Sequence, residues 1–267
     1  MGNLLMLESE LVHLRQLVRQ LQIQVGKAKI PRILLGTSPF IGAGQFGRRA
    51  YEYYFKFYEK PENIVRIILK AADLGVTGIQ ALPYAPIFEA MRRAEESLKE
   101  RLVVVATIGP DNPYDDIRRF QDFNTVAMVL HGEITDTKDK RKISDLLNRI
   151  HAAGYLAGTT THRPFSTLSW LLEEAEVDID LMMMPFNKLG MFMDAEPEEI
   201  AKKAIRLHKP IIGKKVLAAG YLKPKEALEF ALKSGIISVV ALGVASEREA
   251  EETFSTATEI FSGIIRT

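Results

Sequence analysis

The most constraining feature of this chain is a repeated alternation of short apolar runs with stretches of helical periodicity. The runs are Ile33–Gly36, Gly78–Leu82, Leu102–Thr107, Thr125–Leu130, Tyr155–Gly158, Leu181–Met184, Pro210–Lys214 and Ser238–Leu242. Several lack polar alternation, which is typical of parallel strands covered on both faces. Alternating strands and helices indicate repeated βα units, and eight such strands can close a ring. We therefore predict an α/β fold, a (β/α)8 TIM barrel, over residues 29–267.

The helices between the strands follow from the same pattern. They are expected at Glu62–Leu74, Ile87–Glu100, Ile143–Ala153, Thr167–Glu174, Glu198–Leu207 and Lys225–Lys233. Gly75, Gly154 and Gly235 each stand between a helix and the next strand, where glycine commonly ends a helix. No linker rich in Pro, Gly or Ser marks a second globular domain.

The first segment has a different pattern. Its apolar residues recur at alternating spacings of three and four, which places them along one stripe of a helix. They are Leu4, Leu7, Leu11, Leu14, Val18, Leu21 and Val25. We predict an N-terminal amphipathic helix within residues 1–28, ended by Gly26. Two interpretations remain open: the stripe forms a coiled coil that makes a homo-oligomer through residues 4–25, or it packs across its own barrel.

Composition excludes several classes of function. Thirty-five basic and 34 acidic residues leave a net charge of +1, so no strong field favours nucleic acid or a membrane surface. The absence of cysteine excludes disulfides and thiolate chemistry. No apolar run approaches the roughly 20 residues needed to span a bilayer. We expect a cytoplasmic protein with a small-molecule partner and neither a nucleic-acid nor a membrane partner. Abundant Lys, Arg, Glu and Ile are typical of thermophilic proteins.

Polar residues follow most of the predicted strands. Functional groups in such barrels come from the carboxyl ends of the strands and the loops after them. The residues at those positions are Thr37, Ser38, Gln80, Tyr84, Thr107, His131, Glu133, Thr160, His162, Asn187, Lys188, Lys214, Lys215 and Ser246. Their convergence on one mouth predicts the active site of a small-molecule enzyme.

The connection after the first strand, residues 36–60, is rich in aromatic side chains. It carries Phe40, Phe46, Tyr51, Tyr53, Tyr54, Phe55, Phe57 and Tyr58. It is predicted to lie above the mouth of the barrel, either as an aromatic lid or as a small extra helix that buries its own rings.

Short motifs at the strand ends resemble the aldo-keto reductases. The matching segments are Leu35–Phe40, Val129–Gly132, Gly158–Pro164, Pro185–Asn187, Leu217–Gly220 and Leu242–Ser246. The resemblance runs from about Ile33 to Phe254. It implies a barrel oxidoreductase that uses NADP, with Tyr84 as the proton donor and His131 beside it. The cofactor residues that it implies are Thr37, Thr160, Asn187, Gly243, Ser246 and Arg248, the last three around the adenosine phosphate.

The implied catalytic set is incomplete. The family's lysine reads Ile108, its aspartate reads Ile79 or Gln80, and its nicotinamide partners read Met183 and Lys214. An unassisted tyrosine has a pKa of about 10 and is a poor acid at neutral pH. We predict that Lys214 or Lys215 supplies the missing cation.

These two lysines are consecutive in the predicted strand. Their side chains are therefore expected on opposite faces, with one in the barrel interior. Burial there would lower its pKa and permit Schiff-base chemistry, or a neighbouring carboxylate would pair with it.

Two alternative functions remain open. His131, Glu133 and His162 could hold a divalent metal for a lyase, isomerase or hydrolase reaction, since two imidazoles and a carboxylate leave positions open for substrate. The second alternative is a non-catalytic barrel that serves as a binding or scaffold module.

Overall fold

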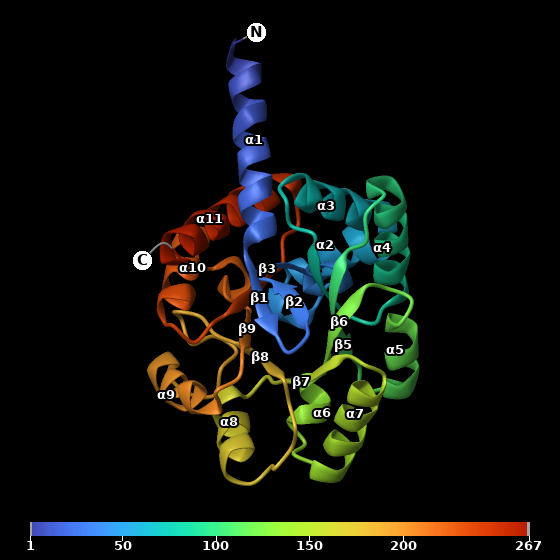
Figure 1. The fold of residues 1–267 in the computed structure, drawn as a ribbon, viewed down its shortest axis with the longest axis vertical. Coiled ribbons are helices and arrows are strands. Elements are labelled where there is room, and N and C mark those ends of the chain that lie inside the picture. Colours follow the sequence, from blue (N-terminus) through green and yellow to red (C-terminus); the bar gives the residue numbers. More distant parts are fainter. Residues whose placement is uncertain (1, 266–267) are drawn as a thin grey trace.

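The computed structural model describes the backbone of residues 2–265 and the side chains of residues 9–264. Parallel strands close into a barrel in the order β10-β3-β4-β5-β6-β7-β8-β9 (Figure 1). They are β3 (Ile33–Gly36), β4 (Gly78–Ala81), β5 (Val103–Ile108), β6 (Thr125–Leu130), β7 (Leu156–Thr160), β8 (Leu181–Pro185), β9 (Ile211–Lys214) and β10 (Val239–Leu242). The predicted (β/α)8 barrel is confirmed, and every predicted strand lies within two residues of an observed one.

Helices surround the barrel (Figure 1). They are α3 (Pro61–Asp73), α4 (Ala85–Leu98), α5 (Pro113–Phe120), α6 (Gly132–Thr135), α7 (Lys140–Ala152), α8 (Pro164–Glu173), α9 (Pro197–Leu207), α10 (Pro224–Lys233) and α11 (Glu247–Ile265). Six of them carry proline in the first two positions, where its missing N–H costs nothing. The predicted helices begin one to three residues after the observed starts, mostly because the predicted ranges exclude these prolines. The short, polar α5 was not predicted.

Side chains alternate between two apolar layers. Leu34, Val105, Val129 and Ile212 fill the barrel interior. Their neighbours along the strands, such as Leu35, pack outward against the helices. This alternation follows from the two-residue period of a strand.

A hairpin interrupts the predicted N-terminal helix. The helix α1 (Gly2–Gln20) is followed by β1 (Gln22–Val25) and β2 (Ala28–Pro31), which pair antiparallel around Gly26. Val25 and Ile30 join the apolar cluster inside the barrel. The prediction that the helix continues to Val25 is therefore wrong. Residues 22–25 also alternate polar and apolar side chains, and burial of the strand face prevails.

Most of α1 projects from the body of the molecule (Figure 1). Where it meets the barrel, Val18 is buried and Leu11 and Leu14 pack against the core. Arg15 pairs with Asp73, so this part of the stripe packs on its own chain. The side chains of Leu4 and Leu7 lie outside the described residues, and the homo-oligomer stays a prediction. None of the helices in the described part of the chain is long and apolar enough to cross a bilayer.

The aromatic segment folds into short helical turns above the mouth. They are η1 (Ser38–Ile41), η2 (Gly44–Phe46), α2 (Arg49–Tyr53) and the π-helical η3 (Tyr54–Tyr58). Phe40 and Phe57 are fully buried against each other, with ring centroids 5.1 Å apart. Arg49 donates a hydrogen bond to the Ala219 carbonyl and Lys56 donates one to the Ala245 carbonyl, which ties the segment to the loops after β9 and β10. The segment therefore buries part of its own aromatic surface and also covers the mouth.

The packing of the hairpin makes a stability prediction. Ile30 is fully buried, so Ile30→Ala should lower the free energy of unfolding by about 2–5 kcal/mol through lost contacts and the cavity left behind. Exposed Val12→Ala on α1 is the control, with an expected change within about 0.5 kcal/mol. Urea denaturation measures both. Equal, small effects would show that the hairpin does not seal the barrel.

Candidate active site

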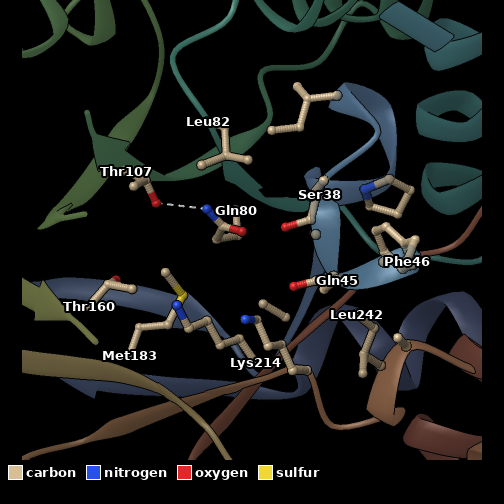
Figure 2. A pocket seen from close by; sticks show the side chains of 18 of the residues that line it. Ser38, Gln45, Phe46, Gln80, Leu82, Thr107, Thr160, Met183, Lys214 and Leu242 are labelled. Carbon is tan, nitrogen blue, oxygen red and sulfur yellow. Dashed lines mark hydrogen bonds between the residues drawn. The ribbon is translucent and has the colours of Figure 1, made fainter. Parts of the chain in front are cut away.

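A cavity of about 840 Å³ opens at the carboxyl ends of the strands, a size suited to a small molecule (Figure 2). Residues from the carboxyl-terminal halves of all eight barrel strands, or from the loops after them, line it. They include Gly36, Ser38, Gln80, Tyr84, Thr107, His131, Glu133, Thr160, His162, Met183, Lys214, Lys215, Leu242 and Gly243. The structure thus brings Tyr84, His131 and both lysines into one space.

Four residues implied as cofactor ligands, Thr37, Asn187, Ser246 and Arg248, do not line this cavity. Thr37 is buried, and its hydroxyl accepts a hydrogen bond from the Leu82 N–H at 3.1 Å. The Asn187 amide is used within its own loop: it donates to the Met191 carbonyl at 2.8 Å and accepts from the N–H groups of residues 189 and 191. Arg248 is exposed on α11. Thr37 and Asn187 shape loops, while Arg248 faces solvent.

Both lysines reach the cavity. The prediction of opposite faces is wrong because β9 ends at Lys214 and Lys215 has a left-handed backbone, with φ 55°. Within the described residues, neither ammonium lies at salt-bridge distance from a carboxylate, so the predicted ion pair is not found. Lys215 instead lies over the Phe192 ring, with Nζ 4.7 Å from its centroid.

Two histidines lie beside the lysines. The His131 and His162 rings meet edge to face, with centroids 5.3 Å apart. The His131 Nδ1 accepts the Glu133 N–H at 3.3 Å, so a neutral His131 ring carries its proton on Nε2. Burial, followed by the charge of Lys214, lowers the pKa of both rings, to about 3 for His162. Both imidazoles are therefore neutral at pH 7.

We call His131, His162, Lys214 and Lys215 the basic cluster. Burial lowers the pKa of both lysines, and for Lys214, whose pKa falls well below its ordinary value, the charge of Lys215 adds to the effect. Each member of the cluster thus disfavours a proton on its neighbours. The protonated forms of all four groups are therefore disfavoured while the cavity is empty.

Asp136 orients one edge of this cluster and was missed in the sequence. Its carboxylate accepts hydrogen bonds from the Thr161 and Thr167 hydroxyls and, at 2.9 Å, from the backbone N–H of His162. The side chain comes from the end of the short helix α6. Its position depends on that turn, which no spacing in the sequence indicates.

The wall where the resemblance implies an Asp–Lys pair carries a neutral pair instead. Gln80 and Thr107 line the cavity, and the Gln80 amide donates to the Thr107 hydroxyl at 2.8 Å (Figure 2). Ile79 and Ile108 pack outward among the helices.

Tyr84 stands at the rim of the cavity. Its side chain is 39% exposed, and burial, followed by the acidic groups around it, raises its pKa. Those groups are Tyr58, Asp111, Glu133 and Asp116, with no lysine among them. The two lysines predicted to assist Tyr84 thus lie beside His131 and His162 instead.

In the turn predicted to hold a phosphate, side chains of the turn itself accept two of the backbone N–H groups. Gly243 lines the cavity, but the Ser246 hydroxyl accepts the Glu249 N–H at 3.1 Å. The Glu249 carboxylate in return accepts the Ala245 N–H at 2.8 Å, so the start of α11 has a capping box. Glu249 and Glu252 also line this part of the cavity. The loss of the Ala245 and Glu249 N–H groups to these bonds, and the charge of the two glutamates, disfavour an anion here.

The metal hypothesis fails on geometry. Within the described residues, no group of three or more His, Asp or Glu side chains is arranged to hold a metal ion. His131, Glu133 and His162 therefore do not form the predicted divalent-metal site.

One polar atom in the cavity wall lacks a partner. Thr160 is 1% exposed, and its hydroxyl oxygen makes no hydrogen bond to any described residue. Figure 2 shows Thr160 on the wall of the pocket. A buried hydroxyl without a partner costs stability, so this group is suited to bind a ligand.

Comparison with known proteins supports the fold. No family model matches the chain, and no curated protein matches it in sequence. Solved structures do match. A protein of Pseudomonas aeruginosa assigned to the aldo-keto reductases has a TM-score of 0.66 at 16% identity, over 91% of this chain and 96% of that one. An aldo/keto reductase from Klebsiella pneumoniae, solved with NADP and acetate, has a TM-score of 0.56 at 16% identity, over 89% of each chain.

These similarities confirm the predicted likeness to aldo-keto reductases at the level of the barrel. The same barrel also matches phosphoribosyl anthranilate isomerase from Thermus thermophilus, with a TM-score of 0.50 at 16% identity, over 73% of this chain and 94% of that one. The fold therefore leaves the reaction to be argued from the site.

Adjacent threonines give a matched stability test. Thr160→Val removes a hydroxyl without a partner, so the free energy of unfolding should stay within about 1 kcal/mol of the unmodified chain or rise. Thr161→Val breaks a hydrogen bond to the Asp136 carboxylate and should cost about 1.5–3 kcal/mol. Urea denaturation of both variants measures the difference. A larger loss at Thr160 would mean that its hydroxyl has a partner in solution.

The low pKa of His162 predicts an acid-sensitive fold. Above pH 6.5 the ring is neutral in both folded and unfolded states and has no effect on the pH dependence. As the pH falls from about 6.5 to about 3, only the unfolded state binds the proton, so stability is lost. His162→Gln should flatten this loss in urea denaturation at several pH values. His13→Gln on α1 is the exposed control, and an equal slope in both variants would contradict the assignment.

Proposed function

We propose that this chain is an enzyme that binds a small carbonyl compound carrying an anionic group, with the carbonyl at the basic cluster. The observation that supports this most strongly is the pair Lys214 and Lys215. They share one cavity with two neutral imidazoles, and no carboxylate among the described side chains lies at salt-bridge distance from either ammonium. Partly buried cations without counter-ions are costly, and an anionic ligand would offset that cost.

The cavity also supplies groups that suit a carbonyl. The neutral His131 ring has a donor at Nε2, and the Thr160 hydroxyl is free to donate. Donors aimed at a carbonyl oxygen stabilise the charge that develops there during reaction. Leu82, Met183 and Leu242 provide apolar surface for the rest of the substrate.

Each polar group takes a role in this proposal. Lys215 binds the anionic group, because its ammonium over the Phe192 ring is favoured in its charged form. His162, neutral at physiological pH, accepts a hydrogen bond from the substrate, and Asp136 holds the His162 backbone N–H in place. Tyr84 keeps its proton at neutral pH and acts as a hydrogen-bond donor at the rim.

Reduction with NADP is the second candidate. A structural neighbour was solved with NADP, and this cavity extends from Gln80 to Gly243 and the start of α11. The residues present do not fit the cofactor well. Met183 offers no hydrogen bond to an amide, Lys214 gives no flat surface for a ring, and Glu249 takes a phosphate donor. The leading proposal therefore does not use NADP.

Thermal melting separates the two candidates. Pyruvate, which carries a carbonyl and a carboxylate, should raise the melting temperature by about 5–10 °C at a concentration near 100 times its Kd. NADPH should cause no shift. Lys215→Met should remove the pyruvate effect, since the anion loses its partner.

Lys188→Met is the control, because Lys188 is exposed, pairs with Glu226 and lies outside this cavity. A shift with NADPH and none with pyruvate would favour the reductase. No shift with either ligand would contradict both proposals and favour the non-catalytic barrel.

A further inference from the structure

We propose that Lys214 is a covalent nucleophile whose amine forms an imine with the carbonyl carbon of the bound substrate. This rests on the proposed function, because it requires a carbonyl compound in the cavity. It goes further by assigning the class of chemistry, Schiff-base catalysis, and the atom that performs it.

The position of Lys214 supports this role. It is the last residue of β9, so its backbone is fixed by the barrel, and the Phe186 N–H donates to its carbonyl at 3.2 Å. Figure 2 shows its side chain reaching from the wall into the open centre of the cavity, on the side opposite Gln80. A nucleophile on a rigid strand end keeps a constant direction of attack.

The surroundings of Lys214 favour the neutral amine. The groups that face it are Lys215 from the same strand end, His131 and His162 from the loops after β6 and β7, and Asp136 from α6. Only Asp136 favours the charged form, and its carboxylate already accepts three hydrogen bonds. A lysine beside another cation in a desolvated site is the environment in which amine nucleophiles are activated.

The two lysines are not equivalent. Lys215 lies over the Phe192 ring, which favours its charged form, and burial is the one cause that lowers its pKa. Lys214 has burial and a neighbouring charge acting together. Lys214 therefore loses its proton first and attacks, while Lys215 stays charged and binds the substrate anion.

The chemical step balances without an oxidant or a metal. The Nζ lone pair of Lys214 forms a C–N bond as the C=O π bond breaks, and the proton that the nitrogen then loses passes to the oxygen, which His131 Nε2–H stabilises by a hydrogen bond. The carbinolamine hydroxyl takes a second proton from solvent and leaves as water while the nitrogen lone pair forms the C=N bond, which gives a protonated imine. That group draws electrons from the adjacent carbon and so acidifies the C–H bonds there.

Borohydride trapping tests the proposal. The full-length protein is incubated with pyruvate, acetoacetate or the uncharged ketone acetone, reduced with borohydride, and digested for mass spectrometry. We expect one dominant adduct, on the peptide with Lys214, with the mass of the ketone less one oxygen atom. Lys214→Met should abolish it, and Lys188→Met should not.

A second variant separates nucleophile from anion binder. Lys215→Met should lower the pyruvate adduct at least about tenfold at neutral pH. It removes the charge that depresses the pKa of Lys214, so the pH midpoint of labelling should move upward. Raising the pH should then restore labelling by acetone but not by pyruvate. Circular dichroism of each variant checks the fold.

These experiments separate the covalent role of Lys214 from the binding of an anionic carbonyl compound. Melting shifts with pyruvate but no selective adduct at Lys214 would overturn the covalent role and leave the binding proposal standing. Adducts spread evenly over surface lysines, unchanged in Lys214→Met, would also overturn it. Neither a shift nor an adduct with any of the three ketones would overturn both.

Discussion

Closure of the barrel is the constraint on which the rest of this structure depends. Eight parallel strands can hydrogen-bond without a free edge only if alternate side chains fill the space inside them. Val25 and Ile30 of the hairpin add to that interior cluster, next to Leu34 and Val105. The opposite end receives side chains from all eight strands, many of them polar, and the cavity lies among them. The site is thus a consequence of which end is filled with apolar side chains.

The strands and most helices were predictable because their periodicities are strong and local. The wrong predictions concern segments that fit both a helical and a strand pattern, or residues whose orientation depends on a turn. Residues 22–25 fit both a helical stripe and a strand, and only burial inside the barrel selects the strand. The left-handed backbone at Lys215 has no signal in the sequence, since a lysine rarely adopts it. The Ser246–Glu249 cap did have one, the Ser-x-x-Glu spacing, which marks a helix start where the two side chains accept backbone N–H groups.

The site differs from its reductase-like pattern by the position of its charge, while the fold stays the same. A hydrogen-bonded amide and hydroxyl, Gln80 and Thr107, satisfy each other on one wall without any net charge. Positive charge is carried on the wall formed by β9, next to the two imidazoles. Tyr84 is left among acidic groups that raise its pKa. The proposed function accordingly places the reactive group on β9, as an amine, and not at the phenol of Tyr84.

Holding two amines and two imidazoles together is unfavourable for an empty cavity, because no described carboxylate lies at salt-bridge distance from either lysine and Asp136 lies 3.8 Å from His162 Nδ1. Each group loses hydration, and each proton raises the cost of the next. The rigid strand ends prevent the side chains from separating, and Asp136 fixes His162 through the loop rather than neutralising the lysines. A fold bears such a local cost where the destabilised groups serve a function, because a bound ligand can relieve it. Burial and the charge of Lys215, which make the empty cavity costly, also lower the pKa of Lys214. A lowered pKa is the condition that the proposed nucleophilic role of Lys214 requires.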